Sequence, residues 1–164
     1  MFFEKQSLGS TALRIGYFVT ITIALVVVFM TEKDAVSAEE LILTLSLFLS
    51  FFIAIYFLVF TIPVLTQITQ RGIEVKYRPW IWNWKVFPWH HIKSVTEENV
   101  DPIGDFGGWG YRFTFKGKRG LIMGNGPAVK IEMKSGKLFV ITTDRKVEFL
   151  RNVAKYLNEE GLNG

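Results

Sequence analysis

The sequence predicts an α+β protein: two membrane-spanning helices, then a curved antiparallel sheet of seven strands that forms a partly open barrel, capped by a C-terminal helix. Three observations predict this order. The first part of the 164-residue chain holds two long apolar runs without charge, residues 15–30 and 41–65. Apolar and polar residues then alternate with period two, and the chain ends in a stretch of helical periodicity. The patterns divide the chain into a helical anchor at residues 1–70 and a β-rich domain at 71–164.

The two apolar runs are long enough to cross a bilayer as helices. A spanning helix needs about 20 mainly apolar residues, so we expect spans at about 11–30 and 41–65. Arg14 can reach the headgroups from the end of the first span, and Pro63 can kink the second. Two buried helices of a soluble core are the alternative, but the rest of the chain is too short to wrap them. A cleaved signal peptide would have a shorter apolar run that ends closer to its cleavage site.

Charge predicts the side of the membrane on which the β-rich domain lies. The connection at residues 31–40 carries one lysine against four carboxylates, whereas Lys5 precedes the first span, Arg14 lies in its first turn, and several basic residues follow the second. Lys and Arg accumulate on the cytoplasmic side. We therefore expect a multi-pass protein of the inner cell membrane with both termini in the cytoplasm. The chain has no cysteine, which excludes disulfides and thiol chemistry.

Seven segments of the β-rich domain alternate apolar and polar residues, as half-buried strands do. Turn signals such as Asn125-Gly126 and Ser135-Gly136 separate them, which favours antiparallel hairpins. Apolar residues at three- and four-residue steps from Val147 to Leu157 then predict an amphipathic helix that packs on the sheet. The expected strands are Arg71–Arg78, Trp82–Trp89, Ile92–Asn99, Tyr111–Lys116, Gly120–Met123, Ala128–Lys134 and Lys137–Thr142.

Two stretches resemble a known family. His90–Arg112 reads HHIKSVTEENVDPIGDFGGWGYR, and Gly124–Leu150 reads GNGPAVKIEMKSGKLFVITTDRKVEFL. They are similar to membrane-anchored bacterial proteins with a pleckstrin-homology-like (PH-like) domain, in a subgroup with a DP…GGWG.R loop. The resemblance implies a PH-like fold and a membrane anchor, but no reaction. The matching positions are Asp101, Pro102, Gly107, Gly108, Trp109, Gly110, Arg112, Ala128, Ser135, Gly136, Phe139, Thr142 and Asp144.

The loop DPIGDFGGWGYR is a candidate interaction or structural loop. Its glycines have no Cβ, so they permit positive φ and a close approach of other groups. Trp109 can cover an open end of the barrel as a lid, or stay partly exposed as an anchor for a partner. Arg112 can hold the loop through Asp105 or Asp101, or bind an acidic partner. The candidate residues are Asp101, Asp105, Phe106, Gly107, Gly108, Trp109, Gly110 and Arg112.

Trp80, Trp82 and Trp84 recur at every second residue and would share one face of a strand. They are either core residues or, with Arg78 and Lys85 beside them, residues of the membrane interface, where Trp is enriched. An excess of Lys and Arg would also draw the domain to an anionic leaflet. Because the basic residues are spread over several strands without a nucleic-acid-binding motif, nucleic acid is not an expected partner.

No catalytic, cofactor or metal site is predicted. His90 and His91 would point to opposite faces of a strand and could not readily share a metal. The glycine-rich GNGP and GGWG lack the spacing of nucleotide-binding loops. We therefore expect a non-enzymatic, membrane-tethered interaction or scaffold module that binds a protein partner or self-associates. The alternative is a lipid-contacting or envelope-stress module that reads the anionic inner leaflet.

Overall fold

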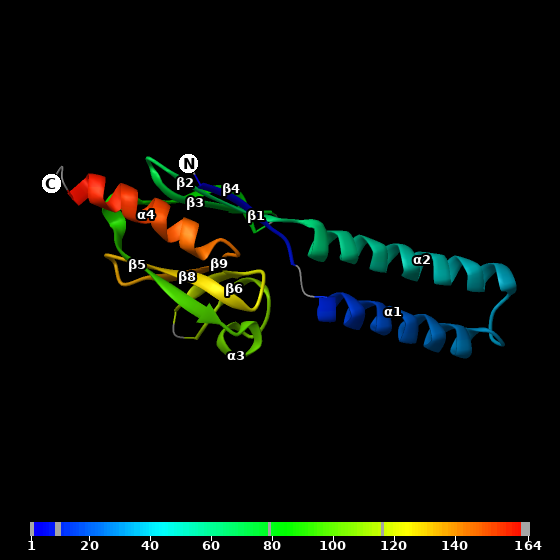
Figure 1. The fold of residues 1–164 in the computed structure, drawn as a ribbon. Coiled ribbons are helices and arrows are strands. Elements are labelled where there is room, and N and C mark those ends of the chain that lie inside the picture. The colour runs from blue at the N-terminus through cyan, green and yellow to red at the C-terminus, as the bar shows by residue number, and fades with distance from the viewer. Residues whose placement is uncertain (1, 9–10, 79, 116, 162–164) are drawn as a thin grey trace. The chain divides into compact units, whose positions relative to one another are not determined.

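The structure, a computed structural model, describes residues 2–8, 11–78, 80–115 and 117–161. The chain forms two compact units: a helical one, Ser10–Thr61, and a β-rich one that joins Met1–Gly9 to Ile62–Gly164. Figure 1 shows the elements of both units. The sequence-based division at residue 70 differs from this arrangement, because the first residues of the chain and those directly after the helices both belong to the β-rich unit.

The helical unit consists of α1 (Thr11–Glu32) and α2 (Ala38–Tyr56), which continues as a π-helical turn, η1 (Phe57–Thr61). Two stretches, Thr11–Glu32 and Ala38–Thr61, are long and apolar enough to cross a membrane, with mean hydropathies of 2.2 and 2.6. None of the residues in their most apolar parts is buried within the protein. These bounds agree with the first predicted span, but the second begins and ends a few residues earlier than predicted. Pro63 therefore follows the helix and does not kink it.

Local contacts explain how α2 begins and how the two helices pair. Ser37 caps α2, because its hydroxyl accepts a hydrogen bond from the Glu40 amide while the Glu40 carboxylate accepts one from the Ser37 amide. The Tyr17 hydroxyl of α1 donates to the Phe52 carbonyl of α2, and the Tyr17 ring packs 5.9 Å from that of Tyr56. A polar group inside the helix pair therefore has a partner on the facing helix.

The β-rich unit contains two sheets. Sheet A has the order β1-β2-β3-β4 and is antiparallel throughout, and sheet B has the order β5-β8-β9-β7-β6. Sheet A comprises β1 (Phe2–Gln6), β2 (Val64–Thr69), β3 (Gly72–Tyr77) and β4 (Ile81–Pro88). Sheet B comprises β5 (Ile92–Val100), β6 (Gly110–Phe113), β7 (Arg119–Ile122), β8 (Gly126–Met133) and β9 (Leu138–Thr142).

Three short or terminal helices complete the unit. A 3₁₀ turn, η2 (Trp89–His91), links sheet A to sheet B, and α3 (Pro102–Phe106) lies between β5 and β6. The last helix, α4 (Lys146–Gly161), packs against β1 and β2 of sheet A and β5 of sheet B (Figure 1). The predicted helix at the C-terminus is therefore confirmed.

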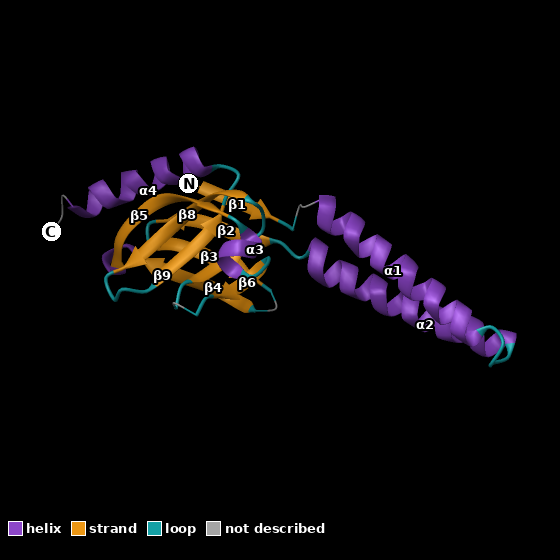
Figure 2. Ribbon diagram, turned by 90° about the horizontal axis from the view of Figure 1, so that it is seen from below, coloured by secondary structure: helices purple, strands orange, loops and turns teal. Residues whose placement is uncertain are grey.

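The structure confirms the α+β class but corrects the predicted sheet. Nine strands in two sheets replace the single seven-stranded sheet, and the described strands form no closed barrel (Figure 2). All seven predicted segments contain a strand, although Lys116, the predicted end of the fourth, lies outside the described residues. The purely antiparallel prediction is wrong, because β9 lies between β8 and β7 and pairs with β7 in parallel.

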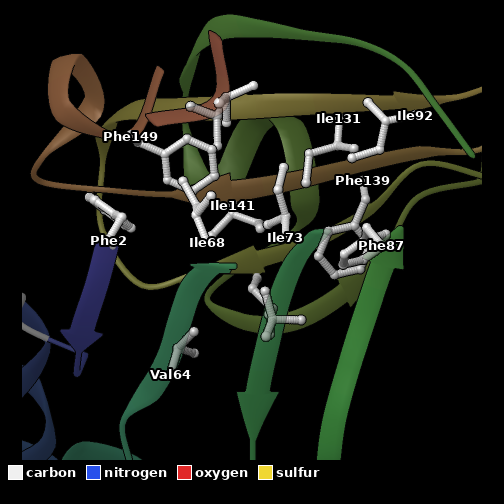
Figure 3. Packing of buried hydrophobic residues seen from close by; sticks show 14 of the residues in the cluster. Phe2, Val64, Ile68, Ile73, Phe87, Ile92, Ile131, Phe139, Ile141 and Phe149 are labelled. Atoms are coloured by element: carbon white, nitrogen blue, oxygen red, sulfur yellow. The ribbon is translucent and has the colours of Figure 1, made fainter. Parts of the chain in front are cut away.

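The main core lies between the two sheets. Sheet A contributes Phe2, Ile68 and Ile73, sheet B contributes Ile131 and Ile141 among others, and all are almost completely buried (Figure 3). Their positions alternate along each strand, so the faces of the two sheets that meet in this core are apolar. The Phe149 ring of α4 closes the core beside Phe2 (Figure 3).

Buried polar contacts join β1 to the start of α4. The Glu4 carboxylate accepts a hydrogen bond of 2.6 Å from the Thr143 hydroxyl and one of 3.0 Å from the Asp144 amide. The Arg145 guanidinium donates to the Phe3 carbonyl at 3.0 Å. Burial raises the pKa of Glu4 above its ordinary value, against the opposing effect of these hydrogen bonds. The N-terminal strand is thus an integral part of the β-rich unit.

Candidate functional site

The loop after β5 folds into the short helix α3. Asp101 caps its start, since its carboxylate accepts from the Ile103 amide at 3.1 Å, and Asp105 accepts from the Asp101 amide at 2.8 Å. Gly107 ends the helix in the left-handed conformation with φ of 66°, and its amide donates to the Ile103 carbonyl. Gly107 therefore serves the backbone geometry of a helix end, and both aspartates serve the start.

Phe106 is the buried aromatic of this loop. It lies in a second apolar cluster on sheet B with Val100, Ile122, Ala128 and Val140. Gly120 makes room for it, because a Cβ at this position would lie 2.7 Å from the Phe106 Cε1 atom. Trp109, by contrast, is only half-buried, and the two roles predicted for it stay open.

Arg112 holds the loop in a different way from the predicted one. Its Nε donates to the Trp109 carbonyl at 2.6 Å, and among the described residues its guanidinium forms no ion pair with Asp101 or Asp105. A Cβ on Gly108 would lie 3.0 Å from the Arg112 Nη2, so this glycine leaves space for the guanidinium. The two aspartates were predicted as partners of Arg112, but they are occupied at the helix start.

The tryptophans near the start of β4 are largely outside the core. Trp80 is 55% and Trp82 65% exposed, and Trp84 is half-buried. Trp82 and Trp84 share a face of β4, whereas Trp80 precedes the strand and stacks on the Tyr77 ring at 5.1 Å. We call Trp80, Trp82 and Trp84 the tryptophan cluster. The core interpretation therefore fails for Trp80 and Trp82.

Two basic residues accompany the tryptophan cluster. The Lys76 ammonium lies 5.9 Å from the centre of the Trp84 ring, and the Arg78 guanidinium lies 5.8 Å from that of Trp82. Lys85, which we expected beside them, lies on the opposite face of β4, with its ammonium 4.9 Å from the Phe139 ring. This aromatic and cationic surface is the kind that Trp, Lys and Arg form at membrane interfaces.

The strand register places the tryptophan cluster at one particular end of sheet A. Gln6 pairs with Val64, Leu65 with Lys76, and Tyr77 with Ile81. This row also contains the two points where the chain leaves sheet A for the helical unit and returns from it. We call Gln6, Val64, Tyr77 and Ile81 the exit row. Trp80 and Trp82 directly flank its last member.

No cluster of metal-ligating groups is found among the described residues. Groups of three or more His, Cys, Asp or Glu side chains that could hold a metal are absent from them. His90 and His91 lie in η2 rather than on a strand, with ring centres 4.2 Å apart and both side chains exposed. The buried carboxylates have structural partners: Glu74 accepts from Gln67, Thr69 and Arg71, and these bonds hold its pKa below the ordinary value even though burial opposes this.

The structure also reveals a basic cavity that sequence reasoning missed. It has a volume of about 480 Å³ and lies at the end of β4 opposite the exit row, between that strand, the β8–β9 turn and the start of β7. Its basic side chains come from Lys85, His91, Arg119, Lys134 and Lys137. The only signal of this cavity in the sequence is the dense positive charge of residues 116–119 and 134–137. No sequence pattern indicates that these two segments lie near Lys85.

Comparison of the chain with protein-family models, with curated proteins and with solved structures gives no match. The PH-like resemblance therefore stays a prediction, and the function has to be argued from the geometry above.

Proposed function

We propose that this chain is a membrane-anchored, PH-like module without catalytic activity, whose β-rich unit lies against the anionic cytoplasmic leaflet through the tryptophan cluster. One observation carries the proposal: the exposed Trp82 lies beside the exit row of sheet A, from which the chain leaves for the first apolar helix and to which it returns after the second. Trp at such a position combines an apolar ring with an N–H that headgroup water can satisfy.

The pairing of β1 with β2 supports a helical hairpin that crosses the membrane twice. Residues before α1 and residues after η1 form one antiparallel ladder, from Phe2 opposite Ile68 to Gln6 opposite Val64. Two strands of one ladder must occupy the same side of a bilayer. Together with the bias of Lys and Arg, this favours a cytoplasmic β-rich unit with the acidic connection outside.

Covalent reach keeps the exit row near the membrane. Only Ile62 and Pro63 separate Thr61, the end of η1, from Val64, the start of β2. An extended chain spans at most about 3.5 Å per residue, so Val64 stays within roughly 10 Å of the helix end, whatever the orientation of the unit. The adjacent Lys76 and Arg78 can then attract anionic lipids, each by roughly 1 kcal/mol.

Quenching by brominated lipid tests this proposal. In proteoliposomes of phosphatidylcholine and phosphatidylglycerol, bromines placed near the headgroups should quench part of the tryptophan emission. Replacing Trp80, Trp82 and Trp84 together by Phe should remove the quenched part, whereas Trp109→Phe should leave it. Quenching that persists in the triple variant would contradict the leaflet contact.

Self-association is a second candidate, favoured by the edge of sheet B. β6 is an edge strand, and Phe113 in it is 60% exposed. Exposed edges with apolar side chains readily pair with another strand, and two copies of β6 could pair around a twofold axis. Sedimentation of the full chain in detergent should then give a dimer that Phe113→Lys converts to a monomer. A monomeric unmodified chain would refute this candidate.

A further inference from the structure

The basic cavity combines an apolar floor with a cationic rim. Phe87 of β4 and Phe139 of β9 lie together at the edge of the core, with ring centres 4.8 Å apart (Figure 3). Met133 and Leu138 extend the apolar lining. A volume of about 480 Å³ is in the usual range for pockets that bind small molecules.

Among the described residues, no carboxylate balances the cations around this floor. No Asp or Glu lines the cavity, and the ion pairs among the described residues involve neither Lys85, Arg119, Lys134 nor Lys137. Burial lowers the pKa of Lys85, and the nearby charges of Arg119 and Lys137 lower it further. These positive charges repel one another, and an anion bound between them would relieve this repulsion.

We propose that this cavity binds a water-soluble organic anion that carries a phosphate group and a small apolar part. The guanidinium of Arg119 and the ammonium groups of Lys85 and Lys137 are the donors that bind phosphate oxygens in proteins. Met133 and Leu138, which are partly exposed, supply most of the contact surface for the apolar part, and the nearly buried rings of Phe87 and Phe139 complete this lining. The site is separate from the tryptophan cluster and from the loop around α3.

The position of the cavity favours a soluble ligand over a lipid headgroup. In sheet A, Ile81 pairs with Tyr77 in the exit row, whereas Phe87 and Pro88 pair with Ile73 and Gly72 at the other end. A strand rises about 3.3 Å per residue, so roughly 20 Å separate the two ends of β4. This choice of source rests on the proposed function, in which the exit row faces the bilayer.

Calorimetric titration of the full chain in phosphatidylcholine nanodiscs tests the site, with phenyl phosphate as the probe. We expect saturable binding that is tighter than that of inorganic phosphate, and none for uncharged phenol. Lys137→Gln and Arg119→Gln should each weaken it roughly tenfold, the effect of losing one charge-assisted contact. Lys155→Gln removes an exposed positive charge from α4, outside the cavity lining, and should leave the affinity unchanged. The absence of saturable binding, or equal weakening by Lys155→Gln, would overturn the proposal.

A second titration distinguishes a soluble phosphate compound from a lipid headgroup as the ligand. The affinity for phenyl phosphate should be the same in nanodiscs enriched in phosphatidylglycerol as in phosphatidylcholine alone. Competition by phosphatidylglycerol would assign the cavity to a lipid headgroup and overturn the soluble source. Failure of the leaflet contact itself would appear separately, as bromolipid quenching that the tryptophan variants do not change.

Discussion

The rings of Phe2 and Phe149 meet edge to face, with centres 5.2 Å apart and planes at 75°, although the residues belong to the first strand and the last helix. Both side chains are completely buried. We expect Phe2→Ala to lower the free energy of unfolding by about 3–5 kcal/mol, the usual cost of emptying a buried aromatic site. Phe3→Ala is the matched control, because Phe3 is 47% exposed and should cost far less. Urea unfolding in detergent measures both, and equal losses would contradict the place of β1 in the core.

Glu4 predicts a specific dependence of stability on pH. Its pKa is raised in the folded state by burial, so folding favours the protonated carboxyl. The resulting stabilisation is complete below the ordinary pKa and is lost as the pH rises through the raised value. Glu4→Gln removes this titration. The stability of the variant relative to the unmodified chain should therefore increase with pH across that window, and a difference that does not change with pH would be inconsistent with the buried carboxylate.

Gly120 and Gly124 form a pair that tests the packing of Phe106. A Cβ on Gly120 would lie 2.7 Å from the Phe106 ring and 2.8 Å from the Ile122 Cδ1, whereas one on Gly124 would have no neighbour within 4 Å. Gly120→Ala should therefore destabilise by about 1–3 kcal/mol through overpacking. Thermal unfolding should show Gly124→Ala close to the unmodified chain. Similar stability of both variants would mean that Phe106 does not pack on β7.

Phe106 and Trp109 should differ in what they contribute to stability. Phe106 is 6% exposed in the cluster on sheet B, and Phe106→Ala should cost about 3–5 kcal/mol. Trp109 is half-buried, so Trp109→Ala should cost clearly less. Denaturant titration of the two variants compares them. If Trp109→Ala were the more destabilising change, Trp109 would be the lid that the sequence suggested as one of its two roles.

The elements with strong local patterns were predictable. The two long apolar helices, seven of the strand segments and α4 all follow from runs of apolar residues or from their period, as in Ala128–Lys134. β1 was not predictable, because its alternation of apolar and polar residues covers only five residues and is followed closely by a long apolar run. β2 was missed because its first residues, Val64 and Leu65, continue the apolar run of α2 and η1 and were included in the predicted second span. The parallel pairing of β7 with β9 depends on contacts across the sheet, which no local period reports.

Only part of the candidate site could be predicted from the sequence. The sequence singled out the loop DPIGDFGGWGYR, but the structure shows that Phe106 rather than Trp109 is its buried aromatic and that Arg112 bonds to a backbone carbonyl. The exposure of Trp82 follows from which face of β4 meets the core, and alternation alone does not reveal that face. The basic cavity joins three segments that are distant in the sequence, so only the fold brings Lys85 near Lys137.

Labelling of single cysteines tests most directly the central claim of a helical hairpin with a cytoplasmic β-rich unit. The chain has no cysteine, so Asp34→Cys, in the connection between α1 and α2, and Lys155→Cys, in α4, each introduce one thiol. In intact cells with a permeable outer layer, an impermeant maleimide should label the cysteine at position 34, and should reach that at position 155 only after the inner membrane is disrupted. Labelling of position 155 in intact cells, or protection of position 34, would contradict the account.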